Sequence, residues 1–269
     1  KEGRSDPNRK IMMELEYYHK DGSTRWVETI VSGVRDEKGN LVAVHGVNRD
    51  ITEHKKAQEE LHRTLDRLNN AMNTTIHVLA AAVEARDPYT AGHQTRAANL
   101  ACAIAAEMGI SRDKVDGIGM AGSIHDIGKL SVPAALLSKS SKLTSVEFSL
   151  IKEHAEKGYE MLKDVESSWP LAEIVYQHHE RLNGSGYPRK LKEEEILLEA
   201  RILAVADVVE AMASHRPYRP ALGIEAALEE IEKNRGVLYD RSVVEACLTL
   251  FRKKGYHLPG WALRSRGAP

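Results

Sequence analysis

The chain has 269 residues, and its 38 Lys and Arg against 39 Asp and Glu give a formal net charge of −1. A nearly neutral chain has no overall attraction for DNA, RNA or an anionic membrane, so none of these is expected as its main partner. No apolar run reaches the roughly 18 residues of a membrane span and no signal peptide is visible, which favours a cytoplasmic protein. Because the chain begins at Lys1 and not at Met, we expect it to be a fragment of a longer protein. A membrane segment upstream of this fragment is compatible with the sequence.

Residues 1–52 are predicted to form a small antiparallel sheet. Residues 26–34 and 41–47 are rich in β-branched side chains, and 13–18 form a third candidate strand. Turn signals at Asp21-Gly22 and at 38–40 separate the three segments. Because three strands cannot build an independent core, this unit is expected to be part of a truncated domain.

Residues 53–75 are predicted to be a linker helix that opens at a cap, Asp50 or Thr52. Apolar side chains recur along it at alternating steps of three and four, and this series continues into the next segment: Leu61, Leu65, Leu68, Met72, Leu79 and Val83. This heptad-like seam has charged flanks and predicts a parallel dimeric coiled coil. The alternative is a helix that packs on its own domain.

Residues 76–269 are predicted to be an all-α domain, so the fold class is mostly α. The residues 144–147, Thr-Ser-Val-Glu, have the pattern of a capping box at a helix start. Periodicity predicts helices over 92–108, 111–124, 144–163, 169–180, 198–213, 223–234 and 240–253.

Histidines and aspartates within these apolar helical segments suggest one buried polar site. The pair His125-Asp126 is weak evidence alone, although at a helix end both side chains can turn toward one ion. Asp207 lies in the apolar run 202–209, where an unpaired carboxylate is costly. The Asp207 carboxylate therefore needs a partner. The candidates are backbone N–H groups, an arginine such as Arg201, and a metal ion.

Four further histidines are candidates for the same site. A lone helical histidine such as His154 is more often a hydrogen-bonded core residue than a ligand. His178 and His179 follow Ile174 at helical spacing, so at least one of the two faces inward. His93 stands at a helix start and is suited to capping or to ligation. A mixed nitrogen and oxygen shell of this kind suits iron, manganese, zinc or cobalt, and two carboxylates favour a pair of ions.

Three motifs carry a family resemblance. The run His125-Asp126 with Lys129, the run 178–180 (His-His-Glu) and the run 184–188 (Gly-Ser-Gly-Tyr-Pro) resemble the HD-GYP subgroup of HD-domain phosphohydrolases, over roughly residues 74–260. The resemblance implies an all-α bundle around a centre of two or three metal ions. It also implies hydrolysis of cyclic di-GMP to pGpG and often on to GMP.

By position, the resemblance implies roles for individual residues. Asp126 and Lys129 would be catalytic, with Lys129 contacting the scissile phosphate. Gly186 and Tyr187 would lie beside the ligand, and Arg216 and Arg219 would hold its phosphates. The implied metal ligands are His93, His125, Asp126, His154, His178, His179 and Asp207.

The sequence departs from the family pattern at two positions. Some members carry a Glu for a third metal where this chain has Tyr89, so we expect two divalent ions, with iron or manganese favoured. Many members carry Asp where this chain has Asn183, a mild change in a loop. Two other functions compete: hydrolysis of another cyclic dinucleotide such as 3′,3′-cGAMP, and a catalytically silent receptor, against which the intact ligand set argues.

The N-terminal part has its own resemblance. Residues 21–28 and 46–53 resemble the C-terminal part of a PAS sensor domain and its exit helix. This layout predicts a homodimer through the linker helix, in which a rotation or register shift of the helix regulates the catalytic domain.

Overall fold

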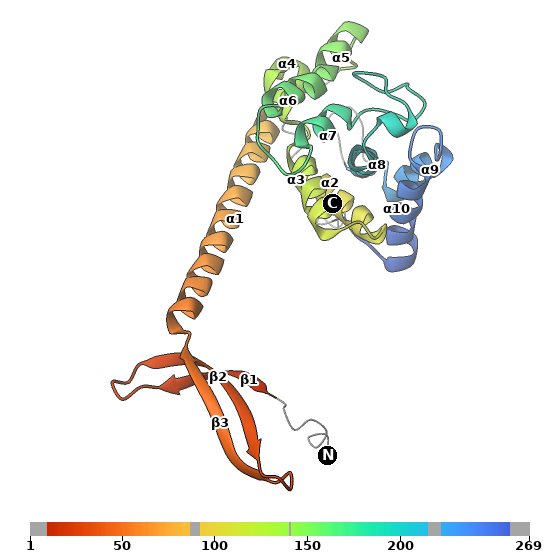
Figure 1. Ribbon diagram of the computed structural model, residues 1–269. Helices are drawn as coiled ribbons and strands as arrows, with labels where there is room; N and C mark the ends of the chain where they lie inside the picture. Colours follow the sequence, from red (N-terminus) through yellow and green to blue (C-terminus); the bar gives the residue numbers. More distant parts are fainter. Residues whose placement is uncertain (1–9, 87–91, 140, 215–221, 259–269) are drawn as a thin grey trace, which may run out of the picture. The chain divides into compact units, whose positions relative to one another are not determined.

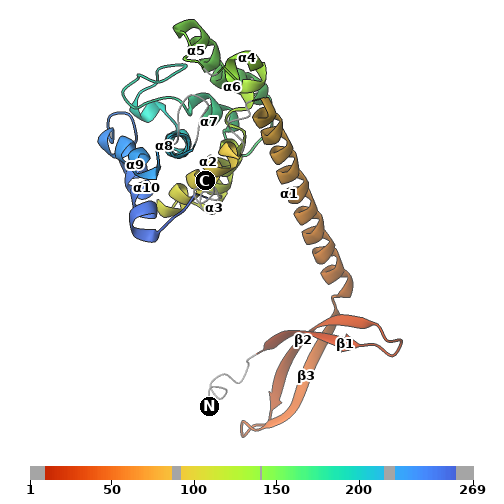
Figure 2. The same ribbon diagram turned by 180° about the vertical axis from the view of Figure 1, so that it is seen from behind.

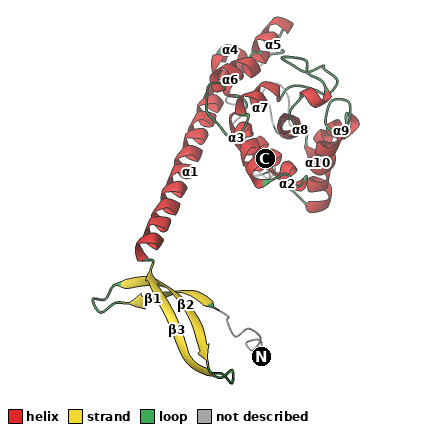
Figure 3. Ribbon diagram, in the orientation of Figure 1, coloured by secondary structure: helices red, strands yellow, loops and turns green. Residues whose placement is uncertain are grey.

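The computed structural model describes residues 10–86, 92–139, 141–214 and 222–258. The chain divides into two compact units, residues 1–72 and 73–269, and the division falls inside the long helix α1 (Thr52–Arg86). Among the described residues, all strands lie in the first unit and the second unit is helical, as the colours of Figure 3 show. The mostly α fold class predicted from the sequence is therefore confirmed. No helix among the described residues is long and apolar enough to cross a membrane.

The first unit contains an antiparallel sheet in the order β1-β2-β3, formed by β1 (Ile11–Tyr18), β2 (Thr24–Arg35) and β3 (Leu41–Asp50). Leu15 pairs with Val27 and Ile30 with Val47 across the strands. At the start of α1, the Thr52 hydroxyl accepts a hydrogen bond of 2.9 Å from the backbone N–H of Trp26. The predicted strands are all present, each somewhat longer than the sequence indicated.

The second unit is a bundle of short helices (Figures 1 and 2). Its elements are α2 (His93–Glu107), α3 (Arg112–Ile124), η1 (Ile127–Ser131), α4 (Ala134–Leu137), α5 (Ser145–Lys152), α6 (His154–Leu162), α7 (Leu171–Gln177), η2 (Glu193–Glu195), α8 (Leu198–Ala213), α9 (Ile224–Lys233) and α10 (Arg241–Lys254). The predicted boundaries of α2, α3, α8, α9 and α10 agree within a residue or two. The short elements η1, α4 and η2 were not predicted.

Helix α8 lies at the centre of this bundle, among α2, α3, α7, α9 and α10 (Figure 1). Ile202, Leu203, Val205 and Val209 on this helix are all fully buried. A helix that is apolar on every side is stable only when other helices surround it. Asp207 therefore lies on the most deeply enclosed helix of the unit.

The predicted helix over 144–163 is two helices, because the chain breaks at Glu153. The Thr144 capping box is present, with the Glu147 backbone N–H donating to the Thr144 hydroxyl at 3.2 Å. Helix α5 ends at Lys152 and α6 begins at His154, with Glu153 between them. Similarly, α7 is shorter than predicted and stops at Gln177, immediately before the two adjacent histidines.

The last turns of α1 pack on the helical unit. Val83 is 2 % exposed and lies in a small cluster with Ile124, Ile127 and Val175. The Arg86 guanidinium donates to the backbone carbonyl of Leu130 at 2.7 Å. These contacts join the last turns of α1, which belong to the second unit, to the residues around the end of α3. The predicted boundary at residue 75, between the linker helix and the all-α domain, stays a prediction.

Candidate metal centre

Seven histidines and aspartates from five parts of the helical unit converge on one buried cluster. His93 begins α2, His125 and Asp126 follow α3, His154 begins α6, His178 and His179 follow α7, and Asp207 lies on α8. Potential ligand atoms lie within 4.8 Å of one another in three overlapping groups: His154, His178 and His179; His93, His125 and Asp207; and His125, Asp126 and His178. All seven residues implied by the resemblance belong to these groups.

The two carboxylates lie between the histidine rings. The His154 Nε2 atom is 3.4 Å from Asp126 Oδ1, and the His125 Nε2 atom is 3.7 Å from Asp126 Oδ2. On the other side, His93 Nε2 is 3.2 Å and His125 Nε2 is 3.8 Å from Asp207 Oδ1. Arg201, the alternative partner for Asp207, pairs instead with Asp240 at 3.1 Å. The neighbours of Asp207 are therefore histidines, and no arginine of the described residues forms an ion pair with it.

The backbone sets the orientation of three rings. The Nδ1 atoms of His125, His154 and His178 lie 2.7, 2.7 and 2.5 Å from the carbonyl oxygens three residues earlier in the chain. A carbonyl oxygen only accepts hydrogen bonds, so each Nδ1 carries a hydrogen, and the neutral form of each ring would present its Nε2 lone pair to the cluster. Protein metal sites commonly orient their histidine ligands in this way.

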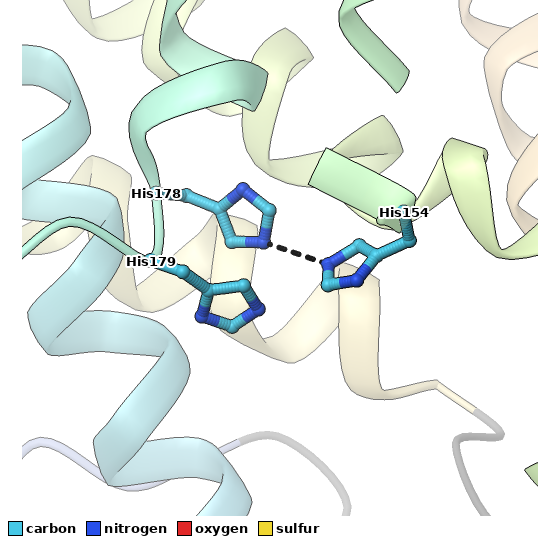
Figure 4. A group of neighbouring side chains, drawn as sticks. All are labelled: His154, His178 and His179. Carbon is cyan, nitrogen blue, oxygen red and sulfur yellow. Dashed lines mark hydrogen bonds between the residues drawn. The ribbon is translucent and has the colours of Figure 1, made fainter. Parts of the chain in front are cut away.

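The arrangement requires a positive group at its centre. The Nε2 atoms of His154 and His178 face each other at 3.4 Å, and His179 lies beside them (Figure 4). Lone pairs and carboxylate oxygens that face one another repel unless a cation or proton lies between them. Because the donors are imidazole nitrogens and carboxylate oxygens, the cluster fits divalent transition metals. The residues present therefore match a metal centre.

The surroundings favour the forms of these residues that bind metal. Burial, together with His125 and His154, lowers the pKa of His178 to about 3, so its ring is neutral near pH 7. Burial alone would raise the pKa of Asp126, but the Lys129 ammonium and His125 outweigh it and hold that pKa well below its usual value. Lys129 lies 2.7 Å from Asp126 Oδ2.

Glu210, one turn after Asp207, is a buried carboxylate that sequence reasoning missed. Its side chain is 0 % exposed and contacts His93 Nδ1. It accepts hydrogen bonds from the Arg96 guanidinium at 2.7 Å and from the Ser214 hydroxyl at 2.6 Å. The signal was available, because Glu210 is an acidic residue directly after the apolar run 202–209 that contains Asp207. With Nδ1 held by Glu210, the His93 Nε2 atom faces Asp207.

Glu180 organises the glycine-rich loop, and this role was also missed. Its two carboxylate oxygens accept the backbone N–H groups of Arg189 at 2.7 Å and of Leu191 at 3.0 Å. Glu180 is 2 % exposed, so these bonds are shielded from water. They close the loop immediately after the histidine pair. A buried acid directly after two candidate ligands was the available signal.

Gly186 and Tyr187 lie against the cluster. A Cβ atom on Gly186 would stand 2.5 Å from the Glu180 Cα atom, so only glycine fits there. The Tyr187 ring lies 4.7 Å from the His179 ring, centroid to centroid. Burial, with Asp207 and Asp126 nearby, raises the pKa of Tyr187, which keeps the phenol neutral. The predicted residues Arg216 and Arg219, and also Tyr89, lie outside the described residues.

Comparison with known proteins gives a consistent assignment. Residues 77–243 match the HD domain and residues 1–53 match the PAS domain. The chain is 36% identical over 218 residues to the cyclic di-GMP phosphodiesterase response regulator RpfG of Xanthomonas campestris, covering 80% of this chain and 58% of that protein. It is 44% identical over 179 residues to a cyclic di-GMP phosphodiesterase of Thermotoga maritima, covering 65% of this chain and 48% of that protein.

A solved structure supports the fold. A cyclic GMP-AMP specific phosphodiesterase of Vibrio cholerae, V-cGAP3, superposes with a TM-score of 0.52 at 17% identity, over 72% of this chain and 50% of that one. The chain belongs to the HD-domain family, and its N-terminal residues match the PAS domain. It spans about half the length of the curated relatives described above.

Proposed function

We propose that the helical domain is a metal-dependent phosphodiesterase that hydrolyses cyclic di-GMP to pGpG or GMP. The main support is the convergence of three Nε2 lone pairs, from His125, His154 and His178, on two buried aspartates. The names of the two curated relatives support the choice of substrate. Divalent cations held there would polarise a scissile phosphate and lower the pKa of water.

We assign two ions, iron or manganese, to this centre. Its three ligand groups overlap at His125 and His178, which suits a shared shell rather than separate sites. The ligands in this proposal are His93, His125, Asp126, His154, His178, His179 and Asp207. Elemental analysis of protein purified without oxygen checks this assignment, and two equivalents of iron or manganese per chain are expected.

Lys129 is assigned to the scissile phosphate. Its ammonium lies beside Asp126, at the edge of the cluster, where a phosphoryl oxygen would gain negative charge during hydrolysis. A positive group held in place for that charge stabilises the transition state more than the bound substrate. Gly186 and Tyr187 would border the ligand, and Arg216 and Arg219 would hold its phosphates.

Two variants test the proposal with cyclic di-GMP and added Mn²⁺, or Fe²⁺ without oxygen, with products resolved by chromatography. Asp126→Ala should lose both metal and hydrolysis. Lys129→Ala should keep its metal and lower kcat by about 10²–10³-fold. Lys157→Ala, at an exposed position on α6, is the matched control and should behave as the parent. Hydrolysis by Asp126→Ala at the parent rate would exclude this metal-centre mechanism.

The likeness to V-cGAP3 supports a second candidate substrate, 3′,3′-cGAMP. Parallel measurements of kcat/KM on cyclic di-GMP and 3′,3′-cGAMP separate the two, and the larger value identifies the preferred substrate. A metal-loaded protein that binds a cyclic dinucleotide and releases no product would be a receptor instead. The same assay therefore distinguishes all three functions.

We further propose that α1 forms a parallel homodimer that links the PAS unit to the catalytic domain. Leu61, Leu65, Leu68 and Met72 follow heptad spacing and are between 41% and 65% exposed in the single chain. An apolar stripe of this spacing on a long helix is buried by a second helix in coiled coils. A change in register along this seam would carry a signal from the PAS unit.

A further inference from the structure

Lys152 is a cation at the edge of the metal centre. The proposed hydrolysis assigns no role to this residue. It ends α5, two residues before His154. Its Nζ atom lies 5.1 Å from the centre of the Tyr187 ring and 4.7 Å from the centre of the Phe148 ring. Tyr187 in turn lies against His179. The Lys152 ammonium is therefore held next to an aromatic ring that borders the cluster.

The charge of Lys152 is not neutralised by a neighbour. Two nearby lysines pair with carboxylates instead, Lys129 with Asp126 at 2.7 Å and Lys139 with Glu147 at 2.6 Å. In the described ranges, no side-chain hydrogen bond or ion pair involves Lys152. Its contacts with the two rings are cation–π contacts, in which the ring faces attract the ammonium. They hold the ammonium in place and leave its hydrogen-bond donors available to an anion.

We propose that Lys152 binds the second phosphate of the cyclic dinucleotide, the one that is not being hydrolysed. This inference rests on the proposed function. A cyclic dinucleotide carries two phosphates on opposite sides of its ring, so only one of them can lie at the histidine and aspartate cluster. The other lies toward the rim, where Tyr187 and Lys152 stand. A lysine ammonium, as a compact point charge, suits a phosphate that needs no bidentate contact.

The alternative is that Lys152 only stabilises the loop through its contact with Tyr187. A purely structural role would affect every substrate equally, because it would disturb the common catalytic cluster. A contact with the second phosphate affects only substrates that have one. The number of phosphates in the substrate therefore discriminates between the two roles.

The test compares cyclic di-GMP with bis(p-nitrophenyl) phosphate, a diester with a single phosphate, in the metal-loaded full chain. Lys152→Met keeps the aliphatic stem on the rings and removes the charge. Loss of a charged hydrogen bond should raise KM for cyclic di-GMP about tenfold or more, with kcat within about twofold. KM for the single-phosphate diester should not change. Lys152→Arg keeps the charge and should restore most of the affinity, and Lys157→Met is the surface control.

An unchanged KM for cyclic di-GMP in Lys152→Met would overturn the inference, and so would an equal rise for both substrates. If the parent protein hydrolyses neither substrate, the proposed function fails separately. The affinity for cyclic di-GMP, measured by calorimetry on parent and Lys152→Met, then decides the role of Lys152. A loss of about tenfold or more would support it, and equal affinities would exclude it.

Discussion

The backbone carbonyl of His154 packs directly against Gly128. A Cβ atom at position 128 would lie 1.9 Å from that oxygen and 2.6 Å from the backbone nitrogen of Gly158. Both obstacles are backbone atoms and cannot rotate away. The missing side chain lets the turn after Asp126 approach the start of α6. This close approach brings His154 within 3.4 Å of Asp126.

Gly128→Ala should therefore separate the two halves of the cluster. We expect the helical unit to lose at least about 2 kcal/mol of unfolding free energy through overpacking, and the metal affinity to fall with it. Urea denaturation followed by helical circular dichroism measures the first effect. Gly46→Ala is the control, because the nearest atom to its new Cβ is 3.8 Å away. Equal urea midpoints for Gly128→Ala and the parent would contradict this account of the packing.

Glu210→Gln should weaken metal binding without unfolding the domain. The Glu210 carboxylate contacts His93 Nδ1, and a neutral amide holds the ring orientation less firmly. Loss of such a partner typically costs about 10–100-fold in metal affinity. Competition with a chromophoric chelator measures the change. Glu245→Gln, at an exposed position on α10, should bind metal as the parent does. Unchanged affinity in Glu210→Gln would mean that Glu210 does not orient His93.

The metal-free protein should lose stability in mild acid. His178 has a pKa of about 3 in the folded state because burial and its histidine neighbours disfavour the charged ring. In the unfolded state a histidine titrates near about 6.5, so the unfolded chain takes up the proton first. The free energy of unfolding should be constant above about pH 7 and should fall as the pH drops below about 6.5.

The decline should approach about 1.4 kcal/mol per pH unit for each such histidine. His154 and His179, whose pKa values are lowered mainly by burial, act in the same direction. The stabilisation by Asp126, whose pKa is also lowered, is lost only below about pH 4, so it does not contribute to this change. Urea titrations with chelator at pH 8, 7, 6 and 5 measure the slope. Constant stability from pH 8 to 5 would exclude buried neutral histidines.

The seam on α1 should determine the oligomeric state. Replacing Leu65 and Leu68 together by Asp places charges on the apolar stripe and should convert a dimer into a monomer in light scattering. Arg67→Asp changes the charge at an exposed position off the stripe and should leave the dimer intact. If the parent protein is itself monomeric at the same concentration as the doubly substituted protein, the coiled-coil proposal is wrong.

Much of the fold could be predicted because its signals are local. The heptad steps of α1, the capping box at Thr144 and the β-branched runs of β2 and β3 each act between residues close in sequence. The break at Glu153 could not be predicted, because the pattern over 144–163 is helical on both sides of it. The start of α6 packs against Gly128, a contact between residues distant in sequence that no local pattern records.

The sequence by itself determined the residue types of the site and the motifs that carry the family resemblance. Only the tertiary structure decided that His93, Asp126 and Asp207 meet, because α2, α3 and α8 come together through non-local packing of apolar faces. It also decided which nitrogen of His93 faces the centre, since this depends on the carboxylate of Glu210, which is distant in sequence. Periodicity records the face of a helix on which a histidine lies, whereas the direction of a lone pair depends on atoms that the folded chain brings within hydrogen-bond distance.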